Sequence, residues 1–125
     1  MNLLGSQLLQ DRGYKRRYPR YRTDLKLTVL VLGSEGHFEV NGWCNQIGEG
    51  GLGAIISTEV SIGELVNLEW SMPIEQQPIS LRAVVRWRNR LQHGFEFLGI
   101  SSQQRAMIRD YCKDLTERGR VEGIT

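Results

Sequence analysis

Short runs in which apolar and polar residues alternate occupy most of the chain, and glycine, serine or proline separates one run from the next. A period of two residues is typical of β-strands that bury one face. The longest run, 79–90, places Leu81, Ala83, Val85 and Trp87 on one face and mostly arginines on the other. The same pattern predicts six strands, over residues 24–33, 37–44, 52–58, 64–72, 79–90 and 91–100.

A helical period follows the last predicted strand. Ser101 and Gln104 form a capping box, which is typical of a helix N-terminus, and Gly119 is expected to end the helix. The apolar stripe of this helix consists of Met107, Ile108, Tyr111, Cys112 and Leu115. Six short strands favour a closed barrel over an open sheet, because closure leaves no exposed strand edge. We therefore predict an all-β fold, a six-stranded antiparallel β-barrel with one C-terminal α-helix.

The size and composition of the chain are those of one small domain. With 125 residues and 40% hydrophobic content, we expect a single modest core. No apolar run approaches about 18 residues, and residues 1–10 lack the features of a signal peptide, so we expect no membrane insertion. Cys44 and Cys112 match no metal or redox spacing and are expected to be reduced, buried thiols. These features together predict a cytoplasmic protein.

Positive charge is concentrated near the start of the chain. Residues 11–26 contain seven of the 16 basic residues but only two of the 14 acidic ones, while the net charge of the whole chain is +2. A basic cluster on an otherwise acidic body indicates a confined anionic ligand more than a broad nucleic-acid surface. The alternative for this segment is a solvated basic linker.

The sequence offers little for catalysis. His37 and His93 have neither a neighbouring nucleophile nor metal-ligand spacing, and each is expected to be structural or exposed. Asp110, Asp114 and Glu117 have the helical spacing of a solvated face. The chain contains no phosphate-binding loop, dinucleotide fingerprint or paired-carboxylate motif. We therefore expect a binding protein, not an enzyme, without metal or cofactor.

The segment 15–22 carries the most informative motif. Arg16 and Arg20 are separated by three residues, one of which, Pro19, fixes its own φ and biases Tyr18 towards extended conformations. A stiff, extended segment presents arginine forks at a small entropic cost. Each fork can pair with a phosphate or with the O6/N7 edge of guanine.

A glycine-rich turn, Gln46-Ile47-Gly48-Glu49-Gly50-Gly51, follows the predicted second strand. Together with the RxxxR pair before the first strand, this turn resembles the PilZ family of cyclic di-GMP receptors. The second motif of that family, Asp/Asn-x-Ser-x-x-Gly, corresponds to Gln46, Gly48 and Gly51. The resemblance extends from about residue 15 to residue 115.

The resemblance implies a receptor whose basic N-terminal arm becomes ordered around cyclic di-GMP and which signals to an effector protein. It implies a flexible segment over 1–14, a barrel domain with its helix over 15–118 and a tail over 119–125. A basic residue directly before the first motif arginine, here Lys15, is associated in such proteins with a stacked pair of ligands. The implied ligand-binding residues are Lys15, Arg16, Arg17, Arg20, Gln46, Gly48, Gly51 and Trp87.

Two positions depart from the family pattern. Gln46 replaces an acidic residue or asparagine, and Gly48 replaces a serine, each at a cost of about 1–3 kcal/mol of binding free energy. One alternative is therefore a degenerate PilZ adaptor that binds no nucleotide and acts through protein contacts. Restoring the hydroxyl by Gly48→Ser is expected to tighten ligand binding. Trp87 has two open roles, as a core or barrel-rim residue by its strand parity or as a ligand contact by the resemblance.

A nucleic-acid-binding barrel is a further alternative, which would use the arginines of the run 79–90 with nearby aromatic residues. The acidic residues elsewhere and the lack of a long basic groove count against it. We therefore expect no nucleic-acid polymer as a partner.

Overall fold

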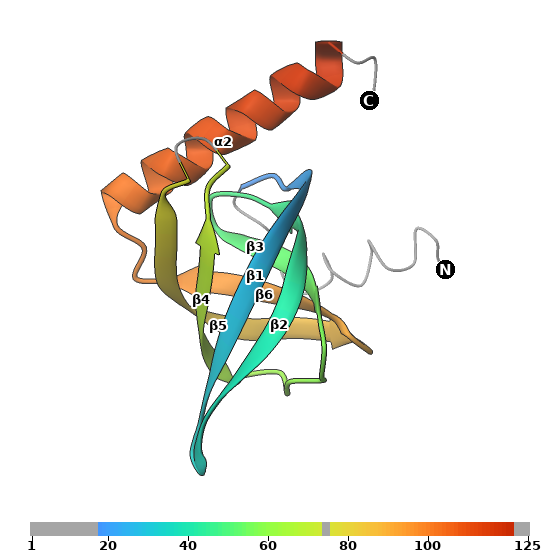
Figure 1. Cartoon of the computed structure of the whole chain (residues 1–125), viewed down its shortest axis with the longest axis vertical. Coiled ribbons are helices and arrows are strands. Elements are labelled where there is room, and N and C mark those ends of the chain that lie inside the picture. The colour runs from blue at the N-terminus through green and yellow to red at the C-terminus, as the bar shows by residue number, and fades with distance from the viewer. Residues whose placement is uncertain (1–17, 74–75, 122–125) are drawn as a thin grey trace.

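Six antiparallel strands form a closed barrel, and one helix follows them (Figure 1). The computed structural model describes residues 18–73 and 76–121, with side chains up to residue 118. The elements are β1 (Tyr21–Gly33), β2 (Gly36–Ile47), β3 (Gly51–Ile56), β4 (Leu65–Ser71), β5 (Pro78–Asn89), β6 (Gln92–Leu98) and α2 (Ser102–Val121). The predicted all-β barrel with a C-terminal helix is confirmed.

The strand order around the barrel is β1-β2-β3-β6-β5-β4, and pairing of β1 with β4 closes it. β1 and β2 form a long hairpin that extends beyond the barrel at the end opposite α2 (Figure 1). Gly36, with a φ of 127°, makes the turn of this hairpin in a conformation that favours glycine. Phe38 lies near that turn and is 50% exposed, because the hairpin there has passed the end of the core.

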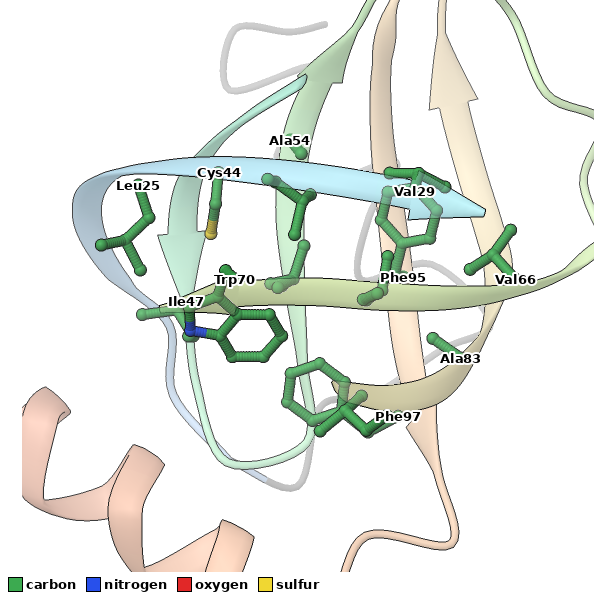
Figure 2. Packing of buried hydrophobic residues seen from close by; sticks show 14 of the residues in the cluster. Leu25, Val29, Cys44, Ile47, Ala54, Val66, Trp70, Ala83, Phe95 and Phe97 are labelled. Atoms are coloured by element: carbon green, nitrogen blue, oxygen red, sulfur yellow. The ribbon is translucent and has the colours of Figure 1, made fainter. Parts of the chain in front are cut away.

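The core is built from the inward-facing residues of all six strands, as predicted from their period of two. Leu81, Ala83 and Val85 are buried on β5, and Phe95 and Phe97 are buried on β6. Figure 2 shows Ala83, Phe95 and Phe97 in the space that the strands enclose. α2 covers one end of the barrel and buries the side chains of Ile108, Tyr111 and Cys112.

The helix begins as predicted but ends later. Ser101 Oγ accepts a hydrogen bond of 3.0 Å from the Gln104 amide, and the Ser101 amide donates one of 3.1 Å to Gln104 Oε1, which confirms the capping box. The prediction that Gly119 ends the helix was wrong, because α2 continues to Val121. An isolated glycine costs a helix only about 1 kcal/mol relative to alanine, and it terminates a helix only where its φ becomes positive.

His93 is fully buried at the end of the β5–β6 hairpin, which confirms a structural role. Its Nδ1–H donates to the Leu91 carbonyl at 2.8 Å, and Nε2 accepts the Val60 amide hydrogen at 2.9 Å. Burial lowers the pKa of the imidazole below its ordinary value of 6.5. Both ring nitrogens are therefore occupied in the neutral form, and protonation would remove the acceptor for Val60.

We expect the free energy of unfolding to fall as the pH drops below about 6.5. Because the folded-state pKa of His93 is lowered, the unfolded chain binds more protons than the folded chain at pH values between that pKa and 6.5. In this range the free energy of unfolding falls by at most about 1.4 kcal/mol for each pH unit. Urea unfolding of His93→Gln should show a flatter pH dependence than the wild type, while His37→Asn, at an exposed histidine, should match the wild type. Equal slopes for wild type and His93→Gln would contradict this role.

Candidate functional site

The chain enters β1 across the glycine-rich turn between β2 and β3. A Cβ added to Gly48 would collide with the backbone carbonyl oxygen of Pro19. One added to Gly50 would lie 3.2 Å from a ring carbon of Tyr18. Glycine at these positions therefore lets residues 18–20, which we call the arm root, lie directly on the turn.

Arg20 is the member of the arm root that reaches the predicted site. A Cβ added to Gly51 would lie only 2.8 Å from Nη2 of Arg20. Its Nη1 donates a long hydrogen bond of 3.5 Å to the side-chain oxygen of Gln46. The structure thus brings together Arg20, Gln46 and Gly51, which the sequence places in two separate motifs.

A row of outward-facing residues crosses four strands beside Arg20. Gln46 on β2 pairs with Gly53 on β3, Gly53 pairs with Gly94 on β6, and Gly94 pairs with Trp87 on β5. Directly paired residues of antiparallel strands share one face of the sheet. The Gln46 side chain lies over Gly53, and the Trp87 indole lies over Gly94. The two glycines, which we call the glycine floor, thus lie beneath an amide and an aromatic ring.

The strand parity predicted for Trp87 was wrong beyond Val85. The register of β5 against β6 shifts between Val85 and Trp87, so Arg86 is an extra residue in a β-bulge. The shift moves Trp87 from the inner to the outer face, where its side chain is only partly buried. This position excludes the barrel core for Trp87 and leaves two roles, a residue of the barrel rim or a ligand contact.

A second irregularity places polar residues beside the floor that the sequence did not indicate. The register of β2 against β3 shifts between Cys44 and Gln46, with Asn45 as the extra residue. Asn45 Nδ2 donates to Gln92 Oε1 at 2.8 Å, and Gln92 Nε2 donates back to Asn45 Oδ1 at 3.3 Å. Gln92 Nε2 also borders Gly53. No periodic pattern signals these two amides, because their position depends on the bulge.

The two cysteines support the backbone under the site and are confirmed as free, buried thiols. Cys44 Sγ donates to the carbonyl of Gln46 at 3.3 Å, and burial raises its pKa to about 12. Cys112 Sγ donates to the carbonyl of Ile47 at 3.7 Å, and burial raises its pKa to about 11. Both groups are therefore protonated near neutral pH and act as weak donors, not as nucleophiles.

The remaining predicted site residues are only partly covered by the structure. Lys15, Arg16 and Arg17 lie outside the described residues, as does the segment 1–14. Within residues 18–73 and 76–121, no three His, Cys, Asp or Glu side chains are grouped so that they could hold a metal ion. No helix in the described part of the chain is long and apolar enough to cross a membrane.

Comparison with protein families decides what this barrel is. The model of the PilZ domain matches residues 14–114, which include the arm, the six strands and most of α2. The chain belongs to the PilZ domain family. A search of curated proteins found no match for this PilZ domain.

Solved structures with the same fold are distant in sequence. The inhibitor of motility MotI/DgrA of Bacillus subtilis is 20% identical with a TM-score of 0.69, over 85% of this chain and 53% of that one. The PilZ domain with c-di-GMP of YcgR from Escherichia coli is 16% identical with a TM-score of 0.66, over 86% and 96%. The PilZ domain of CeSA from a cellulose-synthesizing bacterium is 16% identical with a TM-score of 0.58, over 72% and 90%. The chain thus spans about half the length of MotI/DgrA.

The close approach of Pro19 to Gly48 leads to a stability prediction. Gly48→Ala should lower the free energy of unfolding by about 1–3 kcal/mol, because its Cβ must displace the backbone of the arm root. Gly50→Ala is the matched control, since its Cβ meets only the edge of the Tyr18 ring, which can move. Urea unfolding of both variants measures the difference, and a larger loss for Gly50→Ala would contradict this packing.

Proposed function

We propose that this PilZ domain is a receptor module that binds cyclic di-GMP at the arm root and the glycine floor and passes the signal to an effector protein. The proposal rests mainly on one observation. The guanidinium of Arg20 donates a hydrogen bond to the side chain of Gln46 and also lies next to Gly51. Residues from the first and the second motif therefore line the same surface. A cation beside an amide that carries both acceptor and donor groups suits a ligand containing phosphates and guanine edges.

The shape of the surface supports a planar ligand. Because Gly53 and Gly94 have no side chains, the side chain of Gln46 and the indole of Trp87 lie directly on the sheet and form a low surface beside Arg20. The partly exposed Trp87 indole offers a face on which a purine can stack, an interaction worth about 1–3 kcal/mol per base. The paired amides of Asn45 and Gln92 supply further hydrogen-bonding groups at the rim.

Three further basic residues precede the arm root in the sequence. Lys15, Arg16 and Arg17 directly precede Tyr18 in the sequence, and we propose that they contact the phosphates of the ligand. A stacked pair of ligands would bring about four phosphate charges together and would need such extra cations. The PilZ domain of E. coli YcgR with c-di-GMP has a similar fold, which makes this ligand the first to test.

The chemistry of the described side chains supports binding in preference to catalysis. His93 uses both ring nitrogens in hydrogen bonds to backbone groups. The thiols of Cys44 and Cys112 have raised pKa values and are poor nucleophiles at neutral pH. Two free cysteines also suit a reducing compartment, and we propose the cytoplasm.

A second candidate function has its own supporting observation. The family motif has a serine at the position of Gly48. In this chain a Cβ at position 48 would clash with the carbonyl oxygen of Pro19. Gly48→Ser would therefore have to push the arm root away before its hydroxyl could serve a ligand. This arrangement favours a PilZ adaptor that keeps its arm seated and binds a protein without a nucleotide.

Arg20→Ala should weaken cyclic di-GMP binding by about 10- to 100-fold, corresponding to about 1–3 kcal/mol for a lost arginine fork. Isothermal titration calorimetry measures the change. Arg82→Ala is the matched control, because Arg82 is exposed on the part of β5 that pairs with β4 and should leave the affinity unchanged. Failure of the wild type to bind millimolar ligand would reject the receptor and favour the adaptor.

Selectivity for guanine provides an independent test. Cyclic di-GMP should bind at least about tenfold more tightly than cyclic di-AMP, because adenine presents an amino donor where guanine presents the O6 acceptor to an arginine fork. Competition between the two nucleotides for the same protein measures the ratio. Equal affinities would show that the surface recognises phosphate alone.

A further inference from the structure

The arm root is attached to α2 through a pair of residues that neither motif contains. Arg105 Nη1 on α2 donates a hydrogen bond of 2.8 Å to the hydroxyl of Tyr18. The guanidinium carbon also lies 5.4 Å from the centroid of the Tyr18 ring, within the range of a cation–π interaction. One side chain of α2 thus holds the arm root by two interactions, across 87 positions of sequence.

Beside this attachment, the arm root and α2 line a common cavity. A cavity of about 340 Å³ separates Tyr18, Pro19 and Tyr21 from the face of α2 around Cys112 and Thr116. An unfilled volume contributes no packing attraction, so discrete contacts must hold the chain in place.

A second attachment between this part of the chain and α2 lies further along the sequence, on β1. The hydroxyl groups of Thr23 and Tyr111 share a hydrogen bond of 2.5 Å. Arg20 lies between these two attachments in the sequence, on the stretch that crosses the glycine-rich turn. The position of its guanidinium over Gln46 therefore depends on where Tyr18 is held.

We propose that Arg105 is a positioning residue of the ligand site: by fastening Tyr18 to α2, it keeps the arm root seated and Arg20 directed at Gln46. This inference rests on the proposed function. A seated arm lowers the ordering cost that ligand binding must overcome, so the affinity for cyclic di-GMP depends on the first half of α2. Linkage makes the effect reciprocal, so bound ligand strengthens the attachment of the arm to α2.

The coupling gives the signal a physical route to a protein partner. A partner that binds α2 and engages the Arg105 side chain would release Tyr18 and weaken the ligand site. Conversely, bound ligand would oppose such a partner by the same factor. α2 is accordingly the element that we expect an effector protein to read.

Trypsin can test the fastening without any ligand, because cleavage after Arg20 requires the arm root to leave the turn. In Arg105→Ala the fragment beginning at Tyr21 should appear about fivefold faster than in the wild type, since the open population rises by that factor. Tyr18→Phe, which keeps the ring and loses the hydroxyl, should have a smaller effect. Arg118→Ala, at an exposed arginine of α2 paired with Asp114, should leave the rate unchanged.

Calorimetry with cyclic di-GMP then tests the coupling. Arg105→Ala should weaken cyclic di-GMP binding by about the same factor as it accelerates cleavage. Arg105→Lys keeps a positive charge and should therefore recover part of the affinity and part of the resistance to cleavage. Unchanged cleavage in Arg105→Ala would overturn the fastening, and faster cleavage with unchanged or tighter binding would overturn the coupling. If the wild type binds no cyclic di-GMP, the proposed function and the coupling both fail, while the cleavage rates still decide whether Arg105 fastens the arm.

Discussion

β1 is hydrogen-bonded to β2 along one side and to β4 along the other, and this double pairing closes the barrel. Closure leaves each strand residue with two alternatives, the packed interior or the outer surface. The interior is filled around Phe95, and α2 covers one end of it. On the outside, residues that are distant in sequence are held in fixed rows by the strand register. The two glycines of the floor form one such row with Gln46 and Trp87, and the strand register keeps these four residues aligned.

Two β-bulges interrupt the regular alternation of this scaffold beside the glycine floor. The extra residues Asn45 and Arg86 change the parity of β2 and β5 within a few positions of the floor. As a result, Gln46 and Trp87 face outward at the two ends of the floor instead of continuing the regular alternation. A bulge redirects the side chains that follow it on the strand, and bulges occur frequently beside binding sites.

The glycine-rich turn provides the surface on which the arm root packs. The absence of a side chain at Gly48 lets the Pro19 carbonyl approach the turn, and the same absence removes the hydroxyl of the family motif. The departure at position 48 thus has a structural counterpart in a closely seated arm root. Arg105 strengthens that seating from the helix side, through Tyr18. The missing serine hydroxyl at position 48 and the contact between Tyr18 and Arg105 are therefore both part of the way in which the arm root packs on the barrel.

Local patterns determined a large part of this protein. Alternation with a period of two predicts the strands and the burial of residues such as Leu81 and Phe97, and the capping box predicts where α2 begins. These signals need only neighbouring residues, so they can be identified from the sequence alone. The arginine pair and the glycine-rich turn likewise identified the family, because both motifs are contiguous.

Tertiary structure alone decided how these parts meet. The face of Trp87, the alignment of Gly53 with Gly94 and the contact between Tyr18 and Arg105 all depend on pairings between distant segments. A single bulge reverses strand parity, and whether one forms is settled by hydrogen bonding to the neighbouring strand, not by the period of the strand itself. For that reason the sequence indicated which residues bear the chemistry, and closure of the barrel decided which of them share a surface.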